Sequence, residues 1–119
     1  MSYDVFMRDP INHDDVIQFN DQHQIKGGTF SVEGTTEAWL NITYNYSDHL
    51  YRTMGEKGIR SIYGLSGADS IPILENAIKQ LADDVSEDYW ESTEGNVKRA
   101  LYGLLTFAQL RPDGVWDGD

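Results

Sequence analysis

The feature that most constrains the fold of this chain is a change of hydrophobic period near residue 47. From residue 37 to residue 47 apolar and polar side chains alternate, which is typical of a strand with one buried face. The apolar positions are Ala38, Leu40, Ile42, Tyr44 and Tyr46. Beyond residue 47 the apolar residues recur at helical spacing. Strands followed by helices indicate an α+β fold, with a small antiparallel sheet in the N-terminal half packed against about three helices in the C-terminal half.

Weaker strand patterns occupy the rest of the N-terminal half. They cover residues 3–7, 16–19 and 29–33. Gly34-Thr35-Thr36 is typical of a hairpin connection and would join the strand at 29–33 to the strand at 37–47. We therefore expect these strands to form an antiparallel meander.

Three helices are predicted in the C-terminal half. The first covers residues 47–54, the second starts at Ser70, and the third is capped by Ser92 or Thr93 and ends before Pro112. The second and third helices each carry one apolar stripe. The stripes consist of Ile71, Leu74, Ala77, Ile78, Leu81 and Val85, and of Val97, Leu101, Leu104, Leu105 and Ala108.

The length and composition limit the class of protein. At 119 residues the chain fits one domain, residues 1–119, with a core of its own. It has no cysteine, which excludes disulfides, thiolate nucleophiles and cysteine-ligated metals. Its start, MSYDVFMRDP, lacks the basic and apolar regions of a signal peptide, and no apolar run approaches the ~20 residues of a membrane span. We expect a cytoplasmic protein.

The charge indicates which partners are favoured. Twenty acidic residues against nine basic ones give a net charge of −11. Such a surface repels the phosphates of nucleic acids and of anionic membranes, so direct binding of either is not expected. A host protein with a basic surface is the favoured partner, because long-range attraction speeds its encounter. The alternative is that the charge serves solubility alone.

The C-terminal sequence RPDGVWDGD invites comparison with a calcium-binding loop. With Asp113 as position 1 of an EF-hand loop, Asp117 occupies position 5, but Val115 occupies position 3, where an oxygen ligand is required. We expect a turn that ends the preceding helix and lets Trp116 dock while the aspartates remain solvated. A weak cation site at Asp113, Asp117 and Asp119 is the alternative.

Motifs for catalysis are missing from the sequence. Ser66 lacks the G-x-S-x-G spacing of a nucleophile elbow, and it is predicted to start a helical turn with Asp69 as capping partner. The histidines His13, His23 and His49 share no metal-ligand spacing. We predict no enzyme activity, no cofactor and no metal site.

The strongest candidate for a binding surface is the stretch of residues 83–94, which we call the acidic segment. It carries six acids and no base around Tyr89 and Trp90. Carboxylates around exposed aromatic residues suit a partner surface rich in Arg and Lys. On such a surface the carboxylates can take the place of nucleic-acid phosphates. The candidate partner-binding residues are Asp84, Glu87, Asp88, Tyr89, Trp90 and Glu91. The alternative is a solvated connection whose aromatic side chains fill a gap between helices.

Five stretches of the chain carry a family resemblance: WLNITYNYS, GEKGIRSIYGLSGADSIPIL, DDVSEDYW, TEGNVKRALYGLL and RPDGVWDGD. From Trp39 onward the chain resembles a family of small phage- and prophage-encoded proteins. The resemblance transfers no site residues. It implies a mobile-element context, in which small acidic proteins often modulate host machinery or block host defence, anti-CRISPR proteins among them. Together with the net charge and the acidic segment, it predicts a protein that acts by protein–protein binding, as an inhibitor or modulator of a host nucleic-acid-handling or defence complex.

Two other functions stay open at this point. One is a small-ligand or weak metal-binding domain that uses Tyr44, Tyr46, Arg60 and Tyr63 or the C-terminal aspartates. The other is a structural or assembly component of a phage particle. The sequence leaves open the oligomeric state, and it does not decide whether Trp90 and Trp116 are buried.

Overall fold

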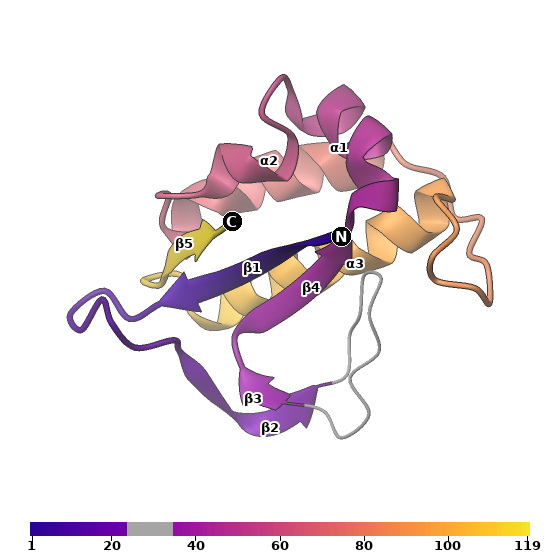
Figure 1. Cartoon of the computed structure of the whole chain (residues 1–119). Coiled ribbons are helices and arrows are strands. Elements are labelled where there is room, and N and C mark those ends of the chain that lie inside the picture. The colour runs from indigo at the N-terminus through magenta and orange to yellow at the C-terminus, as the bar shows by residue number, and fades with distance from the viewer. Residues whose placement is uncertain (24–34) are drawn as a thin grey trace.

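The computed structural model describes residues 1–23 and 35–119 and has the expected α+β architecture (Figure 1). Helices lie behind one face of a small antiparallel sheet. The elements in chain order are β1 (Ser2–Arg8), β2 (Gln18–His23), β3 (Thr35–Glu37), β4 (Trp39–Thr43), the 3-10 helix η1 (Tyr44–Tyr46), α1 (Ser47–Met54), the 3-10 helix η2 (Gly58–Ile62), α2 (Gly67–Lys79), α3 (Glu94–Leu110) and β5 (Val115–Gly118).

The order of the strands differs from the predicted meander. The main sheet has the order β4-β1-β5, and β2 pairs with β3 in a separate ribbon. The N-terminal strand is therefore central, with Val5 opposite Leu40 of β4 on one side and opposite Gly118 of β5 on the other. The meander prediction is wrong because local alternation does not specify which strands pair. The strand predicted at 29–33 lies outside the described residues.

The strand predicted at 37–47 is divided. β3 ends at residue 37, β4 ends at Thr43, and residues 44–46 form a 3-10 turn. Thr43 ends the strand through its side chain, whose Oγ1 accepts a hydrogen bond from the Asn45 amide at 3.2 Å. The weaker strand expected at 16–19 is displaced, because β2 starts at Gln18 and Val16 only forms an isolated bridge to Arg8.

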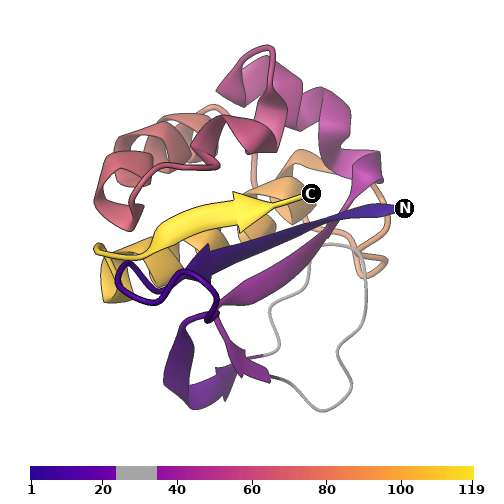
Figure 2. The ribbon, with the colours of Figure 1, turned by 60° about the vertical axis from the view of Figure 1, so that its left-hand side comes forward.

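One face of the main sheet and the helices enclose the core. Along β1 the side chains alternate between buried and half-buried. The buried set packs with the inward residues of β4 and with α2 and α3, and it includes Tyr3, Val5, Met7, Leu40, Ile42, Leu74, Ile78, Leu101, Leu104 and Trp116. The radius of gyration is 13.2 Å. The half-buried set, which starts at Ser2, alternates with the buried set and belongs to the other face of the sheet. Figure 2 shows the helices on one side of the strands.

The three predicted helices are present, and the first has the predicted bounds, Ser47–Met54. α2 begins at Gly67 instead of Ser70, because Ser66 Oγ accepts a hydrogen bond from the Asp69 amide, as its capping role predicted. α3 is capped by Thr93, one of the two expected residues. The stripe of α2 ends earlier than expected, since Val85 is 50% exposed beyond the end of the helix. No described helix is long and apolar enough to span a bilayer.

Candidate functional site

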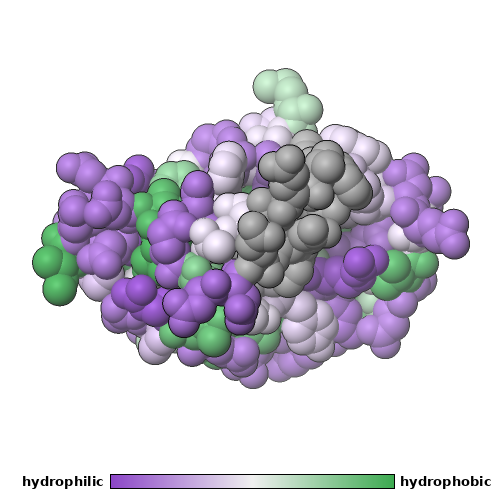
Figure 3. Space-filling view, turned by 90° about the horizontal axis from the view of Figure 1, so that it is seen from below, coloured by the Kyte–Doolittle hydropathy of each residue, from purple (hydrophilic) through white to green (hydrophobic). Residues whose placement is uncertain are grey.

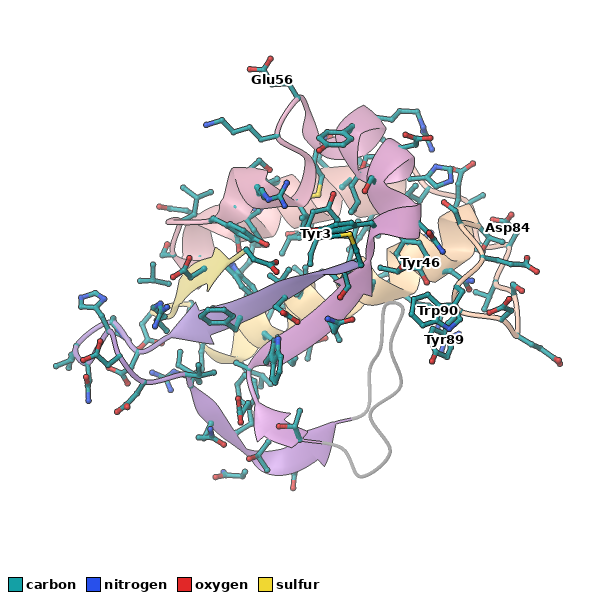
Figure 4. The ribbon with its side chains drawn as sticks, viewed as in Figure 1. Tyr3, Tyr46, Glu56, Asp84, Tyr89 and Trp90 are labelled. Atoms are coloured by element: carbon teal, nitrogen blue, oxygen red, sulfur yellow. The ribbon has the colours of Figure 1, made fainter. Side chains whose placement is uncertain are left out.

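The acidic segment joins α2 to α3 at one end of the molecule (Figure 4), where Asp84, Tyr89 and Trp90 lie together. From residue 83 to residue 93 it belongs to no helix or strand. Its backbone polar groups must therefore find partners elsewhere. Side chains from neighbouring elements supply many of them.

Asn96 holds the segment to α3. Its Nδ2 donates to the carbonyls of Asp88 and Glu91 at 3.1 and 3.0 Å, and its Oδ1 accepts from the Ser86 amide at 3.1 Å. Asn96 is itself buried in the first turn of the helix. Because buried amide groups are costly when unpaired, this residue specifies one path for the segment.

The turn after β4 holds the middle of the segment. The hydroxyl of Tyr46 donates to the Tyr89 carbonyl, and Asn45 Nδ2 donates to the Trp90 carbonyl at 3.0 Å. Burial raises the pKa of Tyr46 to about 12, so its hydroxyl keeps its proton and remains a donor at neutral pH. With these two carbonyls turned inward, Trp90 is left 42% exposed.

His49 of α1 holds the end of the segment. Its Nε2 lies 2.9 Å from the Ser92 carbonyl, and its Nδ1 lies 2.9 Å from the Arg52 guanidinium. This pattern requires the neutral ring with its proton on Nε2, so that Nδ1 can accept from Arg52. Arg52 also lies 3.6 Å from the carboxylate of Glu94. Carbonyls of residues 88–92 are thus all hydrogen-bonded to side chains of the body.

The carboxylates of the segment fall into two groups. Asp84 accepts from the Gly95 amide at 3.2 Å and Asp88 from the Trp90 amide at 3.0 Å, so both stabilise local backbone. Glu87 and Glu91 are exposed, and no hydrogen bond or ion pair joins their carboxylates to the described part of the chain. These two glutamates are available to a partner.

The aromatic pair at the tip of the segment is stacked. The ring centroids of Tyr89 and Trp90 lie 5.5 Å apart with an interplanar angle of 29°. Tyr89 is half-buried and Trp90 is exposed, so the Tyr89 ring packs between the body of the protein and the Trp90 ring. The negative face of an indole attracts Arg and Lys side chains. Lys98 of α3 reaches the segment only at its start, 2.7 Å from Asp83.

All six predicted partner-binding residues therefore lie on one surface segment. Some of them stabilise its backbone, and the others are exposed to a partner. The residues that sequence reasoning missed are those that hold it in place: Asn45, Tyr46, His49 and Asn96. The one sequence signal for them is the polar Asn96 in the apolar stripe of a helix, one position before Val97.

The C-terminal sequence has a structural role. Trp116 is 1% exposed and its Nε1 donates to the buried Ser70 Oγ at 2.7 Å, so the prediction that it docks is confirmed. Asp117 pairs with Arg8 at 2.7 Å, and this contact is the main reason that its pKa is lowered. Among residues 1–23 and 35–119 no group of three His, Cys, Asp or Glu could hold a metal ion.

The tyrosines proposed for a small-ligand site are divided between two places. Tyr46 contacts the acidic segment, whereas Tyr63 lies near Arg60, whose guanidinium is 4.9 Å from the centre of the Tyr3 ring. The Tyr3 ring is also 4.5 Å from that of Tyr44. Burial raises the pKa of Tyr63. The four predicted residues do not converge on one ligand position.

Comparison with known proteins assigns no relationship. No protein-family model matches the chain, and no match was found among curated proteins or solved structures. The function must therefore be inferred from the surface itself.

Proposed function

We propose that this chain acts by binding a protein with a basic surface through its acidic segment. The observation that carries the proposal is the set of carbonyls at residues 88–92, all bonded to side chains of η1, α1 and α3. Water could satisfy the carbonyls of an exposed connection, whereas here their bonds to side chains of three elements hold the segment in one conformation. A segment held in one conformation loses little entropy on binding, and this favours affinity.

The side chains that face outward suit a partner rich in Arg and Lys. Trp90 offers an exposed ring for a cation, and Glu87 and Glu91 offer carboxylates without partners in the described chain. Interfaces concentrate their binding energy in a few such aromatic residues, surrounded by polar ones. The net charge of −11 adds long-range attraction.

The class of partner that we propose is a host protein that handles nucleic acid. Its basic groove is the kind of surface on which spaced carboxylates can replace phosphates. The resemblance to small phage proteins is consistent with an inhibitor or modulator of such a complex. Competition between this chain and nucleic acid for the same groove is the expected mechanism.

The test begins with affinity capture from a host lysate and proceeds to binding kinetics with the captured protein. Trp90→Ala should weaken binding by about 2 kcal/mol or more, mainly through faster dissociation. The double variant Glu87→Lys/Glu91→Lys should slow association about tenfold at low salt and change the melting temperature little. The captured protein should also release bound nucleic acid when this chain is added.

A matched control separates a local interface from general charge. Glu56→Lys/Glu75→Lys makes the same change in net charge at exposed positions outside the segment, and Figure 4 shows Glu56 far from Trp90. This control should keep most of the association rate. If both double variants slowed association equally, the proposed interface would be refuted. Unchanged affinity of the Trp90→Ala variant would refute it as well.

A further inference from the structure

The outer face of the main sheet is a second surface with an unusual composition. Figures 1 and 2 show the helices on the other side of the strands, and no described helix crosses this face. Such a solvated face usually carries polar side chains. Here the row of residues at the start of β4 contains Trp39 opposite Phe6 of β1, and Phe6 is in turn opposite Asp117 of β5. Trp39 is 41% exposed.

The neighbours of this aromatic row are fixed in place. The Arg8 guanidinium lies 5.0 Å from the centre of the Phe6 ring and donates to Asp117 at 2.7 Å. Two residues along the strands, on the same face, Asn41 Nδ2 donates to the Asp4 carboxylate at 2.7 Å. The polar side chains thus cross-link the three strands and leave the exposed ring of Trp39 among them.

A purely structural role accounts for part of this arrangement. An aromatic pair opposite each other on antiparallel strands stabilises a sheet by about 0.2–1 kcal/mol. That role does not require an exposed ring, since a buried or polar pair would stabilise the sheet as well. Figure 3, which views the molecule from below, shows a surface that is mostly hydrophilic with separate hydrophobic patches. The exposed ring of Trp39 is thus the part of the arrangement that cross-strand pairing does not explain.

The charge of the face indicates its occupant. Among the described residues it carries the carboxylates of Asp4, Asp117 and Asp119. The two neighbouring cations already have partners, because Arg8 is paired with Asp117 and Arg60 donates to the Asp119 carbonyl. A second copy of this chain is disfavoured, because two molecules of net charge −11 repel each other. A basic polypeptide matches both the carboxylates and the exposed indole.

The face is continuous with the acidic segment. β4 runs from Trp39 to Thr43, about 13 Å along the strand at 3.3 Å per residue. Two residues later Asn45 donates to the Trp90 carbonyl. We propose that the outer sheet face around Trp39 and Phe6 is a second docking surface for the same basic polypeptide that the acidic segment binds. This inference rests on the proposed function and extends it to a two-tryptophan interface.

The three tryptophans allow a direct test by NMR. Each indole N–H gives one resolved signal, and Trp39→Phe, Trp90→Phe and Trp116→Phe assign them. A nona-arginine peptide, up to about 30 Å long when extended, is more than twice as long as the stretch of about 13 Å along β4 that leads from Trp39 toward the acidic segment. On titration the indole signals of Trp39 and Trp90 should shift together with one dissociation constant. The buried Trp116 signal should stay unchanged, as should the backbone amide of the exposed Glu75 on α2.

Each outcome separates the two proposals. If the Trp90 signal shifts while that of Trp39 stays, the sheet face is not a docking surface and the acidic segment still is. If Trp39 alone shifts, the acidic segment is not the primary site, and the combined interface is refuted. If neither indole signal shifts, or if the Glu75 amide signal shifts equally, the peptide is attracted only diffusely. Either result would overturn both proposed surfaces.

A variant provides a second measurement that does not depend on signal assignment. Trp39→Ala should raise the dissociation constant for nona-arginine roughly three- to fivefold, as expected for loss of one exposed cation–π contact. Its melting temperature identifies any loss of folding. Unchanged affinity in a folded Trp39→Ala variant would contradict the inference.

Discussion

The acidic segment and the C-terminal segment 111–119 have similar compositions, but they place their tryptophans in opposite environments. Each contains several acids, few bases and a central tryptophan. Trp90 of the first is 42% exposed, whereas Trp116 of the second is 1% exposed. Composition alone therefore does not distinguish a tryptophan that builds the core from one that is presented to solvent.

The difference lies in how each backbone is hydrogen-bonded. β5 pairs with β1 on one edge, and on its other edge the Trp116 amide donates to Leu65 and its carbonyl accepts from Gly64 at 3.0 and 2.8 Å. A strand bonded on both edges directs alternate side chains to opposite faces, and Trp116 takes the inner one. In the acidic segment the carbonyls are turned inward to side chains of the body, while Trp90 projects outward.

The largest difference in stability is expected when each of the two tryptophans is replaced by alanine. Trp116→Ala should destabilise the protein by about 3–5 kcal/mol, because it leaves a large cavity and removes the indole N–H that donates to the Ser70 hydroxyl. Trp90→Ala should cost less than about 1 kcal/mol, since its ring is half in solvent. Urea unfolding measures both. Similar costs for the two variants would contradict the contrast between the segments.

A smaller effect is expected where the acidic segment crosses α3. A Cβ at Gly95 would come within 2.7–2.8 Å of the backbone of residues 83–85, which cannot move as a side chain could. Gly95→Ala should therefore cost about 1–3 kcal/mol, although alanine normally favours a helix. It should also displace the segment and shift the Trp90 indole signal.

The control for this variant is Thr106→Ala at an exposed position of the same helix. It gains helix propensity without approaching another backbone, so it should be neutral or slightly stabilising. If Gly95→Ala were stabilising to the same extent, the close packing of the segment against α3 would be disproved.

Much of the architecture was predictable because periodicity reports local structure and burial. The apolar alternation around Leu40 and the stripes that include Leu74 and Leu104 identified buried faces of β4, α2 and α3. Caps were also predictable, since Ser66 and Thr93 act on residues three positions away. These signals are contained within one element, which is why a single sequence reveals them.

Long-range pairing was not predictable on these grounds. Nothing near residue 115 indicates a strand that pairs with Arg8, and β5 is explained only by the packing of Trp116 against Ser70. The candidate site shows the same division. Its acids and aromatic residues were evident from composition, whereas the support from Asn45 and His49 joins positions far apart in the chain.

The last prediction tests the support of the acidic segment through the pH dependence of Tyr46. At pH 8 Tyr46→Phe should be less stable than the wild type by about 1 kcal/mol, because the Tyr89 carbonyl loses its donor.

The folded-state pKa of Tyr46 is raised to about 12, above the value of about 10 for an unfolded chain. The stabilisation is thus fully present below about pH 10 and is lost as the pH rises to about 12. Denaturant unfolding of both proteins should show the difference of about 1 kcal/mol falling to zero or reversing its sign over this interval. The difference between the two proteins isolates Tyr46, because Tyr3 and Tyr63, whose pKa values burial also raises, titrate equally in both. A constant difference from pH 8 to pH 12 would mean that the Tyr46 hydroxyl does not hold the segment.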